Sequence, residues 1–264
     1  MAFPLRHEAV SEHPALRRDG ASTSSYREFG AGAGIATAAA CTWLGQPGWT
    51  RTMRVLPDGC ADMVWNGDAL VVARAHPVAV RVRLQAGRRS VGLRLRCGAA
   101  GAVLGLPACE LPAEPIELRS LLGSLATQAE ARLMEADAVA AQRAILEDLI
   151  AARLKRGHRP DPRILAAVDR LRSPTTRVAM VAGGMSLSTR ELRRRFHADI
   201  GCGPKTLQGI LRFRNFMRQA EKPPAGRGTV AMLAASCGYA DQAHLSRDCK
   251  RLAGSTPRAL VSGR

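Results

Sequence analysis

The chain has 264 residues, of which 46% are hydrophobic and 23% are charged. This composition excludes a disordered protein and is sufficient for two modest domains with their own cores. The net charge of +17 is uneven, since residues 173–264 hold 16 Lys and Arg against 5 Asp and Glu. A charge of +11 on the last third of the chain favours a polyanionic partner there, nucleic acid, over an ordinary solvated surface.

The seven cysteines form no CxxC pair and no Cys/His cluster. The sequence therefore predicts no metal site and no cofactor, and most thiols are expected as small apolar core residues in a reducing compartment. No run approaches the ~18 apolar residues that a membrane span needs, and the N-terminus lacks the pattern of a signal peptide. We expect a cytoplasmic protein with no membrane partner.

The first part of the chain changes from a polar leader to short apolar segments. Residues 1–24 mix polar residues with Pro, Gly, Ser and Thr, which indicates a flexible leader. Segments 69–75, 78–84 and 91–97 are typical of strands, and in the last two Val and Leu alternate with Arg at period two. Residues 25–120 are therefore expected to form a β-rich domain, an antiparallel sheet or a small barrel with one face inward.

A turn is predicted at Pro57-Asp58-Gly59, between two apolar stretches. Four side chains on or beside this turn are candidates for the lining of a pocket: Asp58, Cys60, Asp62 and Trp65. The alternative, a structural turn with a buried Trp, is favoured. No signature in this region names an effector.

From about Leu121 the apolar period becomes helical, and residues 121–160 are expected to form a helical connector. An apolar stripe runs along segment 139–156 and consists of Ile145, Leu146, Leu149, Ile150 and Leu154. The stripe could be a dimer seam, but packing on its own domain is favoured. Asp161 and Pro162 then offer an N-cap and a first helical residue for the next helix.

The last 92 residues carry the same half-size unit twice. The first copy spans 178–204 and the second spans 230–257. Equivalent residues lie 52 positions apart at the start of the unit, as Val178 and Val230 do, and 53 positions apart at its end. One residue has therefore been inserted in the middle of the second copy.

In the first copy, a short helix over 178–184 and a turn lead to a second helix rich in arginine. Ser188 caps this helix and Glu191 follows three residues later, which is the pattern of a capping box. Leu192 and Phe196 face the core, and the candidates for DNA contact lie elsewhere on the helix: Ser188, Thr189, Arg190, Arg193 and Arg194. In the major groove Arg binds guanine in a fork, although each of these arginines could equally contact a phosphate.

In the second copy, the corresponding helix runs from about Asp241 to Leu252, and Cys249 is among its buried residues. Its candidates for DNA contact are Gln242, His244, Ser246 and Arg247. Gln suits adenine, so this helix would favour different bases from its arginine-rich counterpart. A metal or catalytic role for His244 is disfavoured.

These motifs resemble the DNA-binding domain of the AraC/XylS family of bacterial transcription regulators. GYADQAHLSRDCKRLAGSTP resembles the second helix-turn-helix signature of that family, and SLSTRELRRRF followed by GCGPK resembles the first. The resemblance covers 161–264 and implies helix-turn-helix units at 178–196 and 230–252, joined by a linker helix over 205–221. By position, it assigns base reading to Arg190, Arg193 and Arg194 in the first unit and to Gln242, His244 and Arg247 in the second.

One position departs from the family pattern. Cys249 stands where the family usually has Phe, and where the first copy has Phe196. The smaller side chain removes aromatic volume from the second core. The second unit is therefore expected to be looser, unless a neighbouring side chain fills the space.

The N-terminal segments YREF (26–29), CTW (41–43), VLPDGCADMVW (55–65) and VGLRLRCGAAGAVLGLPACEL (91–111) resemble a β-rich domain found on one branch of such regulators. In the family such domains sense small molecules or mediate dimerisation. The expected fold class is therefore α+β: a β-rich N-terminal domain, a helical connector, and an all-α C-terminal domain with two helix-turn-helix units.

The expected function is that of a sequence-specific transcription regulator without enzymatic activity, with double-stranded DNA as its partner. The resemblance also allows RNA polymerase, an unidentified small-molecule effector and a second copy of the chain as partners. Two alternatives stay open. One is a DNA-repair alkyl-transfer protein, which needs a nucleophilic cysteine such as Cys41 or Cys60. The other is an architectural protein whose affinity depends on salt but hardly on sequence.

Overall fold

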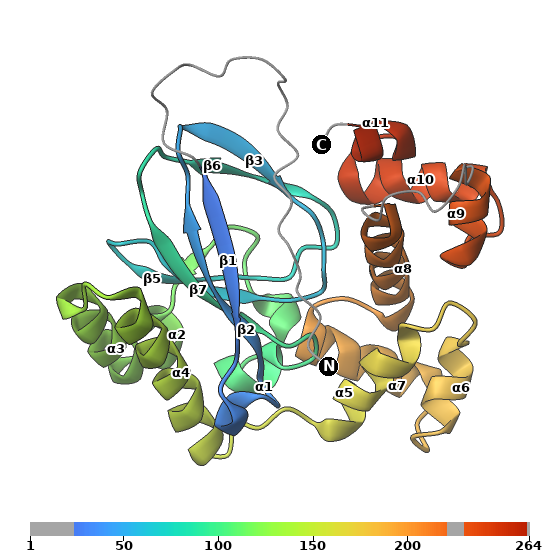
Figure 1. Ribbon diagram of the computed structural model, residues 1–264. Helices are drawn as coiled ribbons and strands as arrows, with labels where there is room; N and C mark the ends of the chain where they lie inside the picture. The colour runs from blue at the N-terminus through green and yellow to red at the C-terminus, as the bar shows by residue number, and fades with distance from the viewer. Residues whose placement is uncertain (1–23, 221–229, 263–264) are drawn as a thin grey trace.

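The computed structural model describes residues 24–220 and 230–262 of the chain. Its N-terminal part is built on a six-stranded antiparallel sheet with the order β1-β2-β7-β4-β5-β8 (Figure 1). The strands are β1 (Ser25–Gly30), β2 (Ala39–Gln46), β4 (Asp62–Trp65), β5 (Leu70–Ala73), β7 (Ser90–Leu95) and β8 (Ile116–Glu117). The α+β class and the antiparallel sheet are thus confirmed, and the strand order is that of an open sheet rather than a closed barrel.

Two further strands pair outside this sheet as a separate ribbon. β3 (Arg51–Val55) and β6 (Val80–Leu84) are antiparallel, and Met53 lies opposite Val82. The alternation in 78–84 predicted a strand with one face inward, but Val82 is exposed. Val80 and Leu84 of the same strand are only half-buried, so alternation along a two-stranded ribbon does not guarantee burial.

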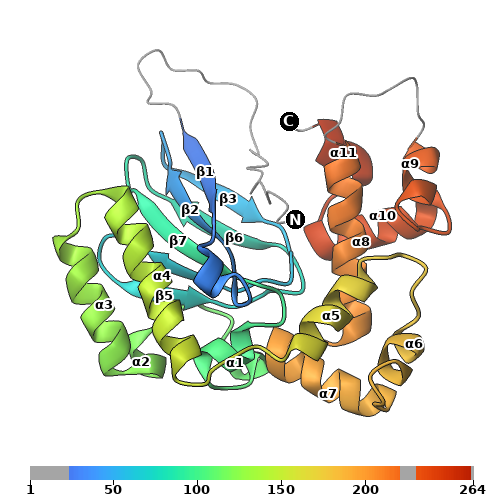
Figure 2. The same cartoon turned by 60° about the horizontal axis from the view of Figure 1, so that its bottom comes forward.

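Two long helices cover one face of the main sheet. They are α3 (Ser124–Glu135) and α4 (Val139–Lys155), and the apolar stripe of α4 packs in the same core as Met63, Trp65 and Leu93 of the strands (Figure 2). Packing of the stripe on its own domain is therefore confirmed, and the dimer seam is wrong. Residues 121–160, expected as a helical connector, contain these two helices, which pack in the same core as the sheet.

Short helical segments complete this domain. They are η1 (Ala33–Ile35), α1 (Ala100–Leu104), η2 (Ala108–Glu110) and α2 (Arg119–Leu122). α1 and η2 both contact the helix α7 (Thr189–Ile200) of the C-terminal part. At Gly101 of α1 this approach is so close that an added Cβ would lie 2.2 Å from the backbone oxygen of Ala198. Gly101 therefore permits helix-to-helix backbone contact between the two domains.

The central strand β7 has both faces covered, whereas the alternation in 91–97 predicted one inward face. Val91, Leu93 and Leu95 are buried in the core against α4. On the opposite face Arg94 is also fully buried, and its guanidinium lies 3.0 Å from Glu28, 3.6 Å from Asp58 and 3.3 Å from Asp62. A buried arginine of this kind requires carboxylate partners, which the neighbouring segments supply.

The C-terminal part is entirely helical in the residues described. It comprises α5 (Pro162–Leu171), α6 (Val178–Gly183), α7, α8 (Pro204–Ala220), α9 (Val230–Ser236), α10 (Gln242–Ala253) and α11 (Pro257–Ser262). Figure 1 shows α8 between a group formed by α5, α6 and α7 and a group formed by α9, α10 and α11. The predicted linker helix is confirmed up to residue 220. Glu221, the last residue of the predicted linker helix, lies outside the described residues, as do residues 1–23 of the predicted leader.

The turns of the two helix-turn-helix units explain the change in offset between the copies. Leu187 donates its backbone N–H to Ala182 in the first turn, and Tyr239 donates its N–H to Ala234 in the second, both at 3.0 Å and 52 residues apart. The helix caps that follow, Ser188 and Asp241, are 53 residues apart. The inserted residue is therefore Ala240, and it lengthens the turn without changing the helices.

No helix within 24–220 or 230–262 is both long and apolar enough to span a membrane.

Candidate nucleic-acid interface

The first recognition helix, α7, presents a polar face at its N-terminal end. Ser188 caps the helix by accepting a hydrogen bond from the backbone N–H of Glu191 at 3.1 Å. Leu192, Phe196 and Ile200 are buried in a core shared with α5, α6 and α8. Packing of that stripe leaves the predicted contact residues exposed to solvent, namely Ser188, Thr189, Arg190, Arg193 and Arg194.

The arginines of α7 differ in their pairing. Arg194 donates two hydrogen bonds to the Glu191 carboxylate, at 2.9 and 2.7 Å, and Arg195 bonds both Glu191 and Asp161. Hydrogen bonds from Arg194 and Arg195 lower the pKa of Glu191 to about 2. No ion pair is recorded for Arg190 or Arg193 in the part of the chain that the structure describes. These two guanidinium groups therefore remain available to a polyanion.

The capping box takes a different form from the one predicted. Its serine half is present, but the Glu191 carboxylate is held by the arginines one turn further along the helix. Two guanidinium groups are stronger partners for a carboxylate than one backbone N–H, so the side chain is drawn away from the cap.

The second recognition helix, α10, is capped by Asp241, which accepts a hydrogen bond from the backbone N–H of His244 at 2.6 Å. Gln242 and Arg247 are exposed, whereas His244 and Ser246 are half-buried. The structure therefore brings Gln242 and Arg247 to the solvent face of α10. The imidazole of His244 lies edge-on to the Tyr239 ring, with 5.2 Å between the ring centroids.

A polar network that the sequence analysis missed joins α10 to the linker helix α8. Arg212 of α8 bonds the buried carboxylate of Asp248 at 3.1 Å and lies 3.4 Å from the imidazole of His244. Its guanidinium also stacks 4.7 Å from the centroid of the Tyr239 ring, and Arg251 provides a second bond to Asp248. The sequence signal for this network is Asp248, which lies next to Cys249 near the buried face of α10. A carboxylate on that face needs a cationic partner.

The second core is closed at Cys249, which is the exception that the expectation allowed. Cys249 is fully buried in a cluster with Phe213 and Phe216 of α8. Leu56, which follows strand β3 in the N-terminal domain, belongs to the same cluster. Aromatic rings from the linker helix and a leucine from the other domain thus pack in the same core as the cysteine.

The β3–β6 ribbon is bonded to the end of α10. Ala79, next to β6, donates its backbone N–H to the carbonyl oxygen of Leu252 at 2.7 Å. Arg54 of β3 donates to the carbonyl oxygen of Ala253 at 3.0 Å and to the hydroxyl of Ser255 at 2.7 Å. Because α1 and η2 contact α7, the N-terminal domain contacts both helix-turn-helix units.

The residues around Pro57-Asp58-Gly59 have structural partners. Asp58 accepts a hydrogen bond from the backbone N–H of Cys60 at 2.8 Å, and Asp62 accepts one from the indole N–H of Trp43 at 2.8 Å. Both carboxylates also face Arg94, and Trp65 is buried. The favoured interpretation, a structural turn with a buried Trp, is therefore confirmed.

The two cysteines considered for alkyl transfer are held as thiols. Burial raises the pKa of Cys41 to about 12, and burial also raises the pKa of Cys60. A nucleophilic cysteine needs its thiolate near neutral pH, so neither environment favours that chemistry. Among the described residues, no group of three or more His, Cys, Asp or Glu side chains is arranged to hold a metal ion.

Two families match separate parts of the chain. Residues 181–262 match the family described as "Helix-turn-helix domain", and residues 28–117 match "Domain of unknown function (DUF6597)". A search of curated proteins finds no match.

Among solved structures, the chain is similar to ToxT of Vibrio cholerae. An apo variant of ToxT is 11% identical with a TM-score of 0.42, over 84% of this chain and 96% of that chain. Wild-type ToxT with a bound unsaturated fatty acid is 11% identical with a TM-score of 0.40, over 92% and 97% of the two chains. Likeness at this level carries no argument about the function of this chain.

The matched regions coincide with the two parts of the fold. The helix-turn-helix match covers α7 to α10 with the linker helix between them, and the N-terminal match covers the strands of the main sheet. The two units, their capped recognition helices and the basic charge of this region agree with the motifs of the double helix-turn-helix domain. The C-terminal part of the chain therefore carries a double helix-turn-helix domain of the AraC type, the domain of DNA-binding transcription regulators, and a β-rich domain precedes it.

Proposed function

We propose that the protein reads two successive major-groove segments of one operator, with α7 in the first and α10 in the second. The observation that carries this proposal is the linker helix α8, which is buried in the cores of both units. Leu207 of α8 packs in the first core, and Ile210 and Phe213 pack in the second. A single rigid helix would set the separation of the recognition helices, as two adjacent grooves about 34 Å apart require.

The two helices would read different bases. Arg190 and Arg193 carry guanidinium groups suited to guanine, and Arg194 could join them if DNA displaces Glu191. Gln242 suits adenine, and Arg247 suits guanine or phosphate. His244 and Ser246 remain candidates for DNA contact on α10. The imidazole of His244 would first have to move away from Arg212. Ser188 and Thr189 would contact phosphate near the start of α7.

The N-terminal domain would modulate this reading by effector binding or by dimerisation. This modulation is supported by the contacts of the N-terminal domain with both units. Its segments α1 and η2 contact α7, and its β3–β6 ribbon contacts α10. RNA polymerase and a second copy of the chain are further partners under this proposal. DNA as the main partner would place the protein in the bacterial cytoplasm, at the nucleoid when bound.

The proposal is tested by selecting bound fragments from genomic DNA with the wild type and with the single variants Arg193→Ala, Arg194→Ala and Arg247→Ala. We expect Arg193→Ala and Arg247→Ala to relax preference at different positions of one site, at a cost of about 1–3 kcal/mol each on the preferred base. Arg83→Ala, on the exposed β6 strand, is the matched control.

Equal weakening of all sequences by Arg193→Ala and Arg247→Ala would show that these arginines contact only phosphate. An affinity that falls steeply with salt and is the same for selected and random DNA would instead establish the architectural alternative.

A further inference from the structure

The two helix-turn-helix units contact each other directly, in addition to sharing the helix α8. Residues 172–177 form the loop between α5 and α6 of the first unit, and this loop extends toward the end of α9 in the second unit (Figure 2). Pro174 of the loop lies against Gly238, in the turn between α9 and α10. A Cβ added at Gly238 would lie 2.1 Å from Cβ and 2.9 Å from Cγ of Pro174. The backbone of the second turn therefore packs directly on the proline ring.

The approach of Pro174 explains why the second turn has a glycine at this position. Gly238 has φ +82°, a conformation that favours glycine. The equivalent position of the first turn, 52 residues earlier, holds the exposed Ser186 at φ +54°. The same turn can therefore hold a side chain at positive φ when the position is exposed. Positive φ alone does not require glycine in the second turn, but the contact with Pro174 does.

The loop that carries Pro174 is anchored to α8. Gln208 of α8 donates a hydrogen bond from its side-chain amide to the backbone carbonyl oxygen of Thr176 at 2.7 Å. Within the loop, Thr176 donates its backbone N–H to the carbonyl oxygen of Ser173 at 3.3 Å. Pro174 therefore lies in a short turn that is bonded to the linker helix.

The second unit is anchored to the same helix. Arg212 of α8 bonds Asp248 of α10 at 3.1 Å, and a Cβ added at Gly209 of α8 would lie 3.2 Å from the guanidinium of Arg251. The two units are thus connected at two places, through α8 and through the contact between Pro174 and Gly238. A single connection would let one unit rotate against the other about the helix, whereas a second contact beside the helix restricts that rotation.

We propose that Pro174 and Gly238 are positioning residues that hold α7 and α10 at a fixed angle, and that they restrict the protein to operators with one spacing between the two segments. This inference rests on the proposed function and goes beyond it, because it assigns part of the specificity to residues outside both recognition helices. Each added base pair moves the second segment by about 3.4 Å along the duplex and about 35° around it. Two recognition helices at a fixed angle cannot follow that change without losing base contacts.

The experiment measures the affinity for the selected operator and for versions with one base pair inserted or deleted between the two segments. We expect the wild type to lose about 10-fold or more at either altered spacing, because one helix then misses its base contacts. Pro174→Gly removes the proline ring. It should bind the original operator within about 2-fold of the wild type and lose only about 2–3-fold at the altered spacings.

A substitution in the same loop is the matched control. Thr175→Gly adds the same backbone freedom next to Pro174 but keeps the proline ring against Gly238. Thr175 is exposed, so its replacement leaves the cores intact. This variant should discriminate between the spacings as strongly as the wild type does.

A double-mutant cycle tests the contact without DNA. Gly238→Ala should lower the urea midpoint of unfolding, because its Cβ meets the proline ring. In the Pro174→Gly background, the nearest remaining atom is Cα of residue 174 at 3.5 Å, an ordinary contact distance. Gly238→Ala should therefore lower the midpoint less than about half as much in that background.

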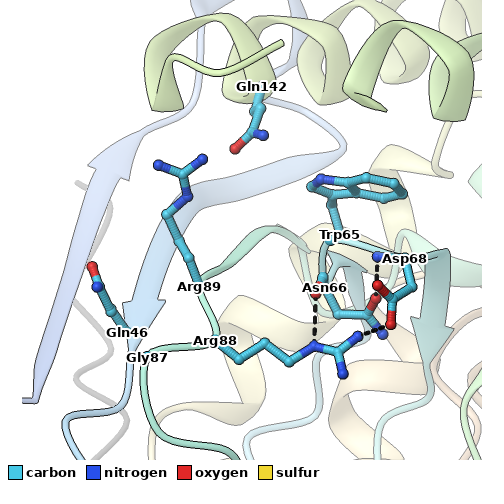
Figure 3. A pocket seen from close by; sticks show the side chains of 9 residues that line it. Gln46, Trp65, Asn66, Asp68, Gly87, Arg88, Arg89 and Gln142 are labelled. Carbon is cyan, nitrogen blue, oxygen red and sulfur yellow. Dashed lines mark hydrogen bonds and ion pairs between the residues drawn. The ribbon is translucent and has the colours of Figure 1, made fainter. Parts of the chain in front are cut away.

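The N-terminal domain also contacts both units, so a variant in this domain is a second control. Arg89 is exposed at the pocket shown in Figure 3, which is lined by residues between Gln46 and Gln142 of that domain. Arg89→Ala should leave the preference for one spacing unchanged. If it relaxed this preference as much as Pro174→Gly does, the effect would not be specific to the contact between the units, and the inference would be wrong.

Equal affinity of the wild type for all spacings, or the same loss in the wild type and Pro174→Gly, would overturn the inference. Additive effects in the double-mutant cycle would do the same. Selection of DNA fragments with Arg193→Ala and Arg247→Ala separates these failures from a failure of the proposed function. If the two variants still change different positions of the site, the proposed function stands without the inference. If Arg247→Ala changes no position, the proposed function is refuted and the inference fails with it.

Discussion

At the scale of single residues, the two helix-turn-helix turns share a backbone conformation but not a residue type. Ser186 in the first turn has φ +54°, and Gly238, its equivalent 52 positions later, has φ +82°. Glycine adopts this left-handed region without steric cost, whereas a side chain adds strain. The first turn therefore carries a local strain that the second turn avoids.

Ser186→Gly is expected to stabilise the protein by about 0.5–1 kcal/mol, because it removes the strain of the left-handed serine. Urea denaturation followed by circular dichroism measures the change. The opposite exchange, Gly238→Ala, should destabilise by about 2 kcal/mol or more, since its Cβ would lie 2.1 Å from Cβ of Pro174. Gly183→Ala is the matched control, because its Cβ would meet nothing within 4 Å. A loss of stability in Ser186→Gly would contradict the account of the first turn.

Asp199 near the end of α7 gives a prediction on pH. Burial, with a contribution from nearby Asp161, raises the pKa of Asp199 to about 6 from its ordinary value of 3.8. The folded state therefore holds this proton more tightly than the unfolded state. The cost of the charged carboxylate is absent below about pH 4, grows between pH 4 and 6, and is complete above that.

Asp199→Asn removes that cost and should raise the free energy of unfolding at pH 7.5 by about 1 kcal/mol, once solvent screening of this half-buried group is allowed for. At pH 4 the variant and the wild type should have the same stability. Thermal unfolding at the two pH values measures the difference, and an equal gain at both would rule out ionisation as its cause.

At the scale of elements, α8 is the helix that joins the two helix-turn-helix units. Its apolar face enters two cores, and its polar face holds α10 through Arg212 and Asp248. Asp248 is buried, so loss of Arg212 would leave its carboxylate with Arg251 as the remaining recorded partner. Burial of a poorly paired charge is costly. The pair of Arg212 and Asp248 therefore helps to hold α10 against α8.

Arg212→Met retains the stem of the side chain and removes the charge. We expect a loss of about 1–2 kcal/mol in stability, and weaker discrimination at the bases read by α10 rather than those read by α7. Denaturation and selection of DNA fragments measure the two effects. Arg214→Met, from the same helix and with no ion pair recorded in the described chain, is the control. Uniform weakening across the whole operator would mean that Arg212 does not position α10 specifically.

At the scale of the whole molecule, the N-terminal domain contributes a residue to the core of the second helix-turn-helix unit. Leu56 packs with Phe213 and Phe216, and the backbone of Ala79 bonds that of Leu252. A rearrangement of the sheet that moved the ribbon would therefore open the second core and displace the end of α10. This contact offers a physical route from the N-terminal domain to the second recognition helix.

Leu56→Ala should cost about 2–3 kcal/mol, because it leaves a cavity in a core built by both domains. Hydrogen exchange should speed up in α9, α10 and α11 more than in the strands of the main sheet. Leu84→Ala, a half-buried leucine of the same ribbon outside this core, is the matched variant. Faster exchange in the main sheet with α10 unchanged would contradict the assignment of Leu56 to the core of the second helix-turn-helix unit.

The sequence by itself determined the features that depend on neighbours along the chain. The repeat at offsets of 52 and 53, the cap at Ser188 and the apolar stripe of α4 follow from local periodicity and capping chemistry. Burial of the apolar faces of α7 and α10 leaves Arg193 and Arg247 exposed, which is why their placement could be predicted.

Only the tertiary structure decided which distant residues meet. Arg94 and Val91 lie in the same alternating strand, yet the arginine is buried because carboxylates from β1, the turn and β4 converge on it. Leu56 joins a core whose other buried members lie between residues 210 and 260. Periodicity predicts which face of a helix or strand is buried, but contacts between distant segments determine what packs against that face.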